Sequence, residues 1–292
     1  MDFCRVEHGV TEKKVVLEDN ERAKPSDKHK IHLTGEKETL LIPLYAKALD
    51  SRSKNSILHD RKADEIVRSI DYDFGKFQES FGHGNIMVVR ARQLDEWVKE
   101  FLKLNPEANV LNLGCGLDTR VSRLSPASSV RWFDVDFPEV IEERQKFFSD
   151  AAGYQMVASS ITDKEWLEKV PNDKPTFVVA DGVFEYLAQD EVKVLVNRVT
   201  SHFPRGQVAF DVMSTYALKM GKADLKEKTG AEHKWSVDEV GRVDELDPKL
   251  RRLANTSVLR LKFFPLKYRL VFGIASAVPR FRNMIRLLRY EF

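Results

Sequence analysis

Residues 109–120 read NVLNLGCGLDTR, a short, mostly apolar run followed at once by a turn that contains two glycines. The run has the length of a buried β-strand. Gly114 and Gly116 allow the backbone to turn sharply and allow a ligand to approach where a Cβ atom would collide. We therefore predict a strand, a ligand-binding turn and then a helix.

The sequence after this segment alternates regularly between strand-like and helical stretches. Five short apolar strands separated by helices predict a parallel sheet covered on both faces, because each crossover returns across the sheet. The fold class is therefore α/β. Beyond residues 109–113, strands are expected at 130–135, 155–158, 176–180 and 206–212, with further strands at 257–261 and in the terminal RLLRYEF.

The composition restricts the class of protein. A chain of 292 residues with 42% hydrophobic residues has enough apolar surface for one elaborated domain. A net charge of +2 does not call for nucleic acid, and no apolar run is long enough to span a membrane. Two cysteines form no disulfide framework, and the start of the chain lacks a signal-peptide core. We expect a cytoplasmic protein with neither nucleic acid nor a membrane as its partner.

Metal binding is not expected, because the seven histidines are scattered without metal-ligand spacing.

Two acidic residues follow the expected second strand. Asp134 lies twenty positions after Gly114, and Asp136 points to the same face of the strand. A carboxylate at this place accepts the hydroxyls of a ribose, which suits any adenosine-bearing cofactor. Thr119 occupies the third glycine position of the dinucleotide fingerprint. The pattern therefore favours S-adenosylmethionine over NAD, and both stay open on these residues alone.

Six motifs in order carry a family resemblance. They read ETLLIPLYAKALDSR, SILHDRKADEIV, VVRARQLDEWV, NLGCGLDTR, WFDVDFPEVI and VVADGVFEYL. From about residue 34 to the C-terminus the chain resembles the leucine carboxyl methyltransferase family. It is most similar to the branch of small-molecule carboxyl O-methyltransferases typified by the tetracenomycin polyketide synthesis enzyme. The resemblance implies a Rossmann-like class I methyltransferase that uses S-adenosylmethionine, with a mostly parallel seven-stranded sheet, helices on both faces and an N-terminal helical lid.

The sequence also predicts a division of the chain. Residues 1–30, which are dense in charge and aperiodic, are expected to form a flexible arm, and residues 31–292 a single domain. Within that domain we expect a helical cap over 31–105 and a cofactor-binding core over 106–214. Residues 215–292 would supply a substrate-side insertion and the last part of the sheet.

The site residues that the resemblance implies surround the cofactor. Gly114, Cys115 and Gly116 would line its amino-acid moiety, and Asp134, with Asp136 beside it, would hold the ribose hydroxyls. Arg90 would pair with the methionine carboxylate, since a guanidinium makes bidentate contacts.

Further site residues follow the later strands. Asp181 and Gly182 would lie near the amino group of the cofactor. Ser160 or Ser159 would contact the adenine, with Ile161 packed on the ring. Tyr186 would lie near the transferred methyl group and is the candidate catalytic residue.

The implied reaction is methyl transfer to a carboxylate or hydroxyl oxygen of a small molecule. A carboxylate is already ionised at neutral pH and needs no base. A phenol or alcohol would need one, and the candidates are Asp211, His83, His233 and Tyr186. The alternatives are methylation of a C-terminal leucine in a protein, a non-catalytic cofactor-binding module and an NAD-dependent oxidoreductase.

Two features concern the surroundings of the site. Tyr45, Phe184, Tyr216 and Trp235 are expected to form an aromatic wall for the acceptor. The stretch from Lys249 is rich in Lys and Arg, which allows an anionic partner, a membrane surface or nucleic acid. We favour a simpler interpretation, in which the basic residues flank helices whose apolar sides pack on the sheet.

Overall fold

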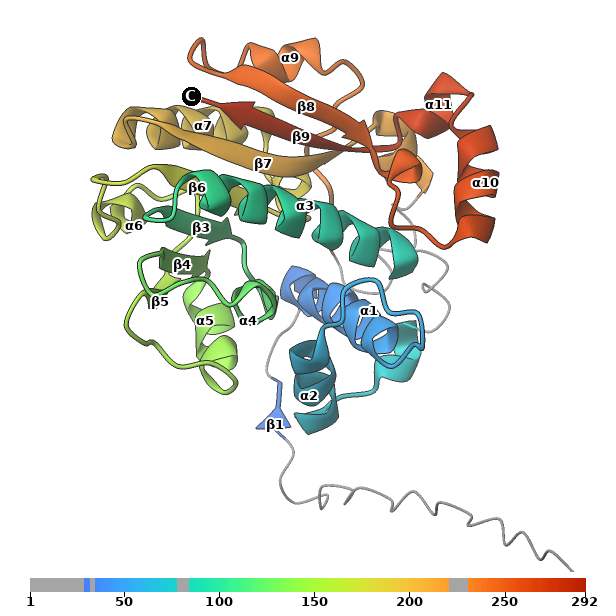
Figure 1. Cartoon of the computed structure of the whole chain (residues 1–292), viewed down its shortest axis with the longest axis horizontal. Coiled ribbons are helices and arrows are strands. Elements are labelled where there is room, and N and C mark those ends of the chain that lie inside the picture. Colours follow the sequence, from blue (N-terminus) through green and yellow to red (C-terminus); the bar gives the residue numbers. More distant parts are fainter. Residues whose placement is uncertain (1–28, 32–34, 78–83, 221–230) are drawn as a thin grey trace, which may run out of the picture.

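The computed structural model describes residues 29–31, 35–77, 84–220 and 231–292 (Figure 1). The predicted arm lies almost wholly outside these residues, and so does His83. The cap, core and C-terminal divisions stay a prediction.

The centre of the molecule is a seven-stranded sheet with the order β5-β4-β3-β6-β7-β9-β8. β3 to β7 run parallel, and β9 pairs antiparallel with both β7 and β8. The predicted mostly parallel sheet is confirmed. Its strands are β3 (Asn109–Leu113), β4 (Arg131–Asp136), β5 (Tyr154–Ala158), β6 (Thr176–Ala180), β7 (Gly206–Met213), β8 (Arg251–Ser257) and β9 (Ile285–Glu291).

The strand expected at 257–261 is wrong. β8 ends at Ser257, and Val258–Arg260 form the 3-10 helix η5. Val258 and Leu261 are both buried at this turn. These two apolar residues, whose spacing suggested a strand, instead hold the chain against the sheet at the point where the chain leaves β8.

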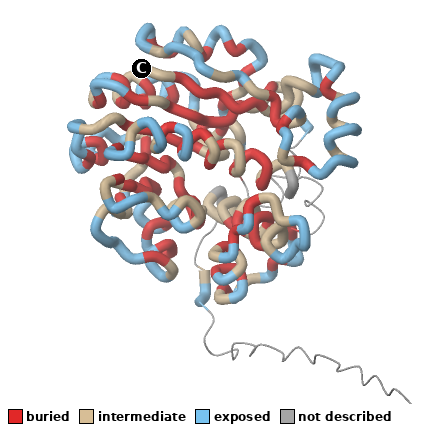
Figure 2. The backbone as a smooth tube through the Cα atoms, in the orientation of Figure 1, coloured by how far each residue is buried: buried red, intermediate tan, exposed pale blue. Residues whose placement is uncertain are grey.

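Alternate residues of the strands serve two separate cores, as the pleat of a sheet requires. Val110 and Phe177 face one core, which α3 (Gly84–Leu104) covers with Trp97 and Phe101. The residues between them face a second core, to which α6 (Glu165–Glu168) contributes Trp166 and α7 (Gln189–His202) several valines. Helices therefore cover both faces, and Figure 2 shows the buried strands between more exposed helices.

The N-terminal helices form a layer of their own beside α3 (Figure 1). η2 (Gly35–Leu40) leads into α1 (Leu41–Ser51), and α2 (Arg61–Ser69) packs against α1 around a third core. The short parallel strands β1 (His29–Lys30) and β2 (Ile70–Asp71) pair at the edge of this layer.

The remaining helices are short. α4 (Arg120–Leu124) follows the glycine turn, α5 (Pro138–Gln145) follows β4, and η4 (Phe184–Tyr186) follows β6. α9 (Gly241–Asp244) precedes β8, and α10 (Leu266–Ala275) and α11 (Pro279–Arg282) lie between β8 and β9. Among the helices that the structure describes, none has the length and apolar character needed to cross a bilayer.

Candidate active site

The turn after β3 has the conformation that its glycines predict. Gly114 and Gly116 have φ angles of +58° and +50°, in the left-handed region. A Cβ on Gly114 would lie 2.7 Å from Val183 Cγ2, and one on Gly116 would lie 2.9 Å from Leu40 Cδ2. Both the backbone conformation and the close neighbours therefore require glycine at these positions.

Arg144 on α5 supports this turn from beneath. Its Nη1 donates to the carbonyl oxygens of Gly116 at 3.0 Å and Asp118 at 2.7 Å, and its Nη2 donates to Asp134. The side chain is fully buried. Sequence reasoning missed Arg144, because its partners lie far away along the chain and no local motif marks it.

Both carboxylate oxygens of Asp134 accept hydrogen bonds from protein donors. Its Oδ1 accepts from Asn112 Nδ2 at 3.0 Å and Trp132 Nε1 at 2.9 Å. Its Oδ2 accepts from Tyr154 Oη at 2.8 Å and from Arg144. The residue has no exposed surface. The expectation that Asp134 holds ribose hydroxyls does not fit these contacts.

Asp136, two residues further, lies directly against the glycine turn. Its Oδ2 accepts from the Gly116 amide at 2.7 Å, and its Oδ1 accepts from the Phe137 amide at 2.8 Å. Burial raises the pKa of Asp136 to about 6, against the lowering effect of these two amides. Each oxygen keeps further acceptor capacity at the carboxyl end of β4.

Arg90 on α3 lies between two acidic residues from neighbouring strands. Its Nε is 2.6 Å from Asp181 Oδ1, and its Nη1 donates to Asp211 Oδ2 at 2.7 Å. Burial alone would lower the pKa of Arg90, but Asp211 and Asp181 together raise it. Gly182, with φ +74°, brings its backbone so close that a Cβ would lie 2.8 Å from Arg90 Nη2. Sequence reasoning placed Arg90 and Asp181 at one site, and the structure brings them into contact.

A buried ion-pair network extends from this pair to the glycine turn. Arg120 contacts Asp181 Oδ2 at 2.9 Å, Asp95 Oδ1 at 2.7 Å and Asp118 Oδ2 at 3.0 Å. Asp118 in turn accepts from Lys47 Nζ of α1 at 2.7 Å. Burial alone would raise the pKa of Asp118, but Arg123, Lys47 and Arg120 hold it well below its usual range. The network fixes α1, α3 and α4 around the turn.

Glu185 was not singled out from the sequence, although it lies beside Tyr186. Its side chain is 4% exposed, and Oε2 has no hydrogen-bond partner among the described residues. Burial, together with the charge of Asp211, raises its pKa to about 8, although Arg90 acts in the opposite direction. A buried acid with a raised pKa is a feature that functional sites often have, so Glu185 is a candidate functional residue.

Tyr186 packs on His233, with ring centroids 5.1 Å apart, and hydrogen-bonds with the side chain of Thr39. Burial and the Glu185 charge raise the pKa of Tyr186, so its phenol stays protonated. Burial lowers the pKa of His233. Three segments far apart in the sequence therefore meet beside η4.

The other predicted cofactor residues lie at neighbouring strand ends. Ser160 Oγ is 2.8 Å from Thr162 Oγ1, and Ile161 is buried in the core near Trp166, whose Nε1 donates to its carbonyl at 3.1 Å. Cys115 is a free, buried thiol whose pKa burial raises well above its usual range. No group of metal-ligating side chains occurs among the described residues.

The expected aromatic wall is wrong. Phe184 and Trp235 belong to the buried sheet core, and Phe184 packs on Phe210 with centroids 4.8 Å apart. Tyr45 stacks on Phe74 in the N-terminal layer, and Tyr216 contacts Phe281. Sequence spacing alone did not separate core aromatics from site aromatics.

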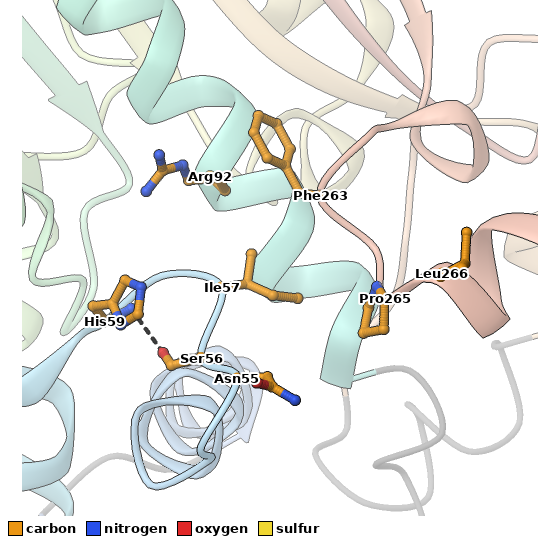
Figure 3. Close-up of a pocket in the computed structure, with 8 residues that line it drawn as sticks. All are labelled: Asn55, Ser56, Ile57, His59, Arg92, Phe263, Pro265 and Leu266. Atoms are coloured by element: carbon orange, nitrogen blue, oxygen red, sulfur yellow. Dashed lines mark hydrogen bonds between the residues drawn. The ribbon is translucent and has the colours of Figure 1, made fainter.

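A cavity of about 440 Å³ lies outside the glycine turn, between the loop before α2, helix α3 and the start of α10 (Figure 3). None of the predicted site residues lines it. The lining residues are Asn55, Ser56, Ile57, His59, Arg92, Phe263, Pro265 and Leu266.

Comparison with known proteins now decides the family. The model of the leucine carboxyl methyltransferase family matches residues 40–200. The tetracenomycin polyketide synthesis O-methyltransferase TcmP of Streptomyces glaucescens is 39% identical over 267 residues, covering 90% of this chain and 98% of TcmP. The chain belongs to the leucine carboxyl methyltransferase family. It is an S-adenosylmethionine-dependent methyltransferase, and S-adenosylmethionine is its cofactor.

A second relative agrees with this assignment, and a solved structure agrees with the fold. The S-adenosyl-L-methionine-dependent methyltransferase dpfgK of Gibberella zeae is 32% identical, covering 80% of this chain and 86% of dpfgK. A solved DUF574 family protein of Streptomyces avermitilis has a TM-score of 0.60 at 10% identity, covers 91% of this chain and 97% of its own, and shows the same fold. The oxidoreductase and the non-catalytic alternatives are therefore excluded for this methyltransferase.

Proposed function

We propose that the methyltransferase transfers a methyl group to a carboxylate oxygen of a small molecule. The observation that carries this proposal is the similarity to TcmP over almost the whole of both chains. The N-terminal layer lies next to this site, because Lys47 of α1 pairs with Asp118 of the glycine turn and Thr39 hydrogen-bonds with Tyr186. We propose that this layer restricts access to the site, which suits a small acceptor better than a protein terminus.

The residues around the glycine turn are those that we propose for the cofactor. We propose that Gly114 and Gly116 admit its amino-acid moiety and that Asp136, rather than Asp134, binds the ribose hydroxyls. Arg90 has two nitrogens engaged by Asp181 and Asp211 and keeps Nη2 for a carboxylate. Asp181 and Gly182 would lie near the amino group.

The adenine would lie at the carboxyl end of β5, beside Ser160 and Ile161. The bound cofactor supplies a sulfonium methyl group that is already activated for displacement. The protein then contributes alignment of the acceptor and exclusion of water.

We propose that Tyr186 and Glu185 act on the acceptor. With its raised pKa, Tyr186 donates a hydrogen bond rather than accepting a proton. We propose that it orients the acceptor oxygen beside His233. A carboxylate acceptor needs no general base, so this role is sufficient for methyl ester formation.

A hydroxyl acceptor is the second candidate, and Glu185 is the observation that favours it. A phenol loses a proton during methyl transfer, and a buried carboxyl with a pKa of about 8 can accept that proton above neutral pH. The two candidates therefore differ in their dependence on Glu185.

The deciding experiment supplies S-adenosylmethionine labelled on its methyl group together with aromatic acids, phenols and a peptide ending in leucine. We expect label on an aromatic acid, in a product that mild alkali cleaves, because esters hydrolyse and ethers do not. Alkali-stable label on a phenol would select the second candidate. Label on the peptide alone would contradict both and favour the protein-modifying alternative.

A further inference from the structure

The C-terminal part of the methyltransferase has a one-sided charge composition. From Pro248 to Tyr290 it contains eleven Lys and Arg residues and no Asp or Glu. Those on the sheet are engaged: Arg289 pairs with Glu100 at 2.7 Å and Arg252 with Asp244 at 3.0 Å. Lys262, Lys267 and Arg269, at and beside α10, are exposed and have no ion pair among the described residues.

Helix α10 is apolar on two sides. On one side, Phe272 packs against Phe264 at 4.9 Å and Tyr268 at 5.8 Å between ring centroids, which attaches the helix to the core. On the other side, four aliphatic side chains are mostly exposed: Leu266 69%, Leu270 64%, Val271 61% and Ile274 79%. The interpretation that the apolar residues of this stretch pack on the sheet therefore holds for one side of α10 and not for the other.

This exposed side forms a stripe at helical spacing. Leu266, Leu270 and Ile274 follow one another at four-residue intervals, so they lie in one row along α10. No residue of α10 is buried. Figure 1 shows the helix at the edge of the molecule, next to α11 and on the side where β9 begins. We use the name α10 face for the surface formed by this row of three residues together with Val271, Lys267 and Arg269.

We propose that the α10 face binds the surface of an anionic lipid bilayer. A short helix with protruding aliphatic side chains and flanking cations has the composition of interfacial helices, which insert to the depth of the lipid headgroups. The unpaired cations supply the complementary charge, and each is worth about a fivefold gain in binding to an anionic membrane. The proposal departs from the sequence expectation of no membrane partner, and it does not depend on the acceptor.

A second copy of the chain is a poorer occupant of this face. A twofold contact places the same patch of each copy against the other. The Lys267 and Arg269 side chains of the two copies would then face each other. No Asp or Glu between Pro248 and Tyr290 would be available to neutralise them. Repulsion between like charges opposes such a contact.

The test is co-sedimentation of the full chain with vesicles of phosphatidylcholine alone and of phosphatidylcholine mixed with phosphatidylserine. We expect binding to the mixed vesicles that weakens as salt is added, and little binding to the neutral ones. Leu270→Ser with Ile274→Ser should reduce binding at least about tenfold, because it removes exposed apolar area that would enter the lipid. Lys267→Glu with Arg269→Glu should reduce it further, since it replaces attraction by repulsion.

Matched variants control for nonspecific effects. Leu104 is 78% exposed at the end of α3, and Lys193 is exposed on α7. Leu104→Ser and Lys193→Glu should bind vesicles as the native chain does. Unchanged thermal melting and cofactor affinity would show that each α10 variant folds.

Three results would overturn the proposal. The first is equal binding of the native chain to both vesicle types, and the second is native binding by the folded α10 variants. The third is that the native chain binds no vesicles and sediments as a dimer, whereas the Leu270→Ser, Ile274→Ser variant sediments as a monomer. That outcome would assign the face to self-association.

Discussion

Asp134 and Asp136 show how two similar residues on one strand acquire different roles. They lie two positions apart on β4 and point to the same face. Asp134 is enclosed by Asn112, Trp132, Tyr154 and Arg144, whereas Asp136 contacts the amide of Gly116. We propose that the first stabilises the protein beneath the turn and that the second binds the cofactor.

Substitution separates these two roles. Asp136→Asn should weaken S-adenosylmethionine binding by about 1 to 3 kcal/mol, the loss expected for a hydrogen bond to a charged group, with little loss of stability. Asp134→Asn should mainly lower the free energy of unfolding, because it leaves the buried Arg144 without its counter-ion. Calorimetric titration and urea unfolding measure the two effects. The assignment of the two roles would be contradicted if Asp134→Asn lost cofactor affinity without losing stability while Asp136→Asn kept its affinity.

The raised pKa of Asp136 predicts a pH dependence. Its folded pKa of about 6 lies above the ordinary value of 3.8, so the stability it contributes is present below about pH 4 and is lost as the pH rises through 6. Cofactor binding should run the other way, because the ionised form is the better acceptor for ribose hydroxyls. We expect affinity to fall as the pH is lowered through about 6. Calorimetry at several pH values checks this, and Asp136→Asn should flatten the profile.

Glu185 predicts a second pH profile, which depends on the acceptor. With a phenol, the turnover rate should rise with pH around 8, and Glu185→Gln should remove the rise, because the amide cannot accept a proton. With a carboxylate, the rate should vary little between neutral pH and 9 in either protein. Initial rates with one acceptor of each kind measure this. A pH-dependent rise that persists in Glu185→Gln would exclude Glu185 as the base.

At the scale of elements, buried ion pairs determine how the helices meet the sheet. α3 carries Arg90 and Asp95, which reach the ends of β6 and β7 and the helix α4. Apolar contacts attach α3 to the sheet face, but these charges fix its position along the strands. A buried ion pair stabilises little in net terms, yet removing one partner leaves a charge uncompensated.

Arg120→Ala tests this network. It removes one of the two cations that pair with Asp95 and with Asp181, at a fully buried position, so the free energy of unfolding should fall by about 3 to 5 kcal/mol. Arg131→Ala is the matched control, because its pair with Asp173 is exposed and should contribute almost nothing. Urea unfolding of both variants compares them. Equal losses would mean that burial of the network has no energetic consequence.

At the scale of the whole molecule, the cofactor should stabilise the fold as one unit. Its proposed contacts come from α3, β4, β6 and the glycine turn, so binding selects the folded state over the unfolded chain. At about 100 times its Kd, a ligand adds about 2.7 kcal/mol to the free energy of unfolding. We expect S-adenosylmethionine to raise the melting temperature by several degrees, and to raise it less in Asp136→Asn. No shift at saturation would contradict the proposed site.

Local patterns predicted much of the fold because the information lies within short segments. The apolar runs of β3, β4, β6 and β7 and the glycines at 114 and 116 appear in the structure as expected. The 3-10 turn after β8 did not follow from its pattern, because a buried turn and a buried strand share the same apolar spacing. Aromatic residues such as Phe184 were equally ambiguous, since sequence does not show which neighbours enclose a side chain.

The sequence by itself determined the α/β class, the left-handed turn at Gly114 and Gly116, and the family, since each depends on residue types at fixed local spacing. Only the tertiary structure decided that Asp134 is enclosed while Asp136 faces the turn. It also decided, within the part of the chain that it describes, that Glu185 is buried without a hydrogen-bond partner on Oε2 and that one side of α10 is exposed. The physical reason is that burial and charge pairing depend on groups brought together from distant parts of the chain.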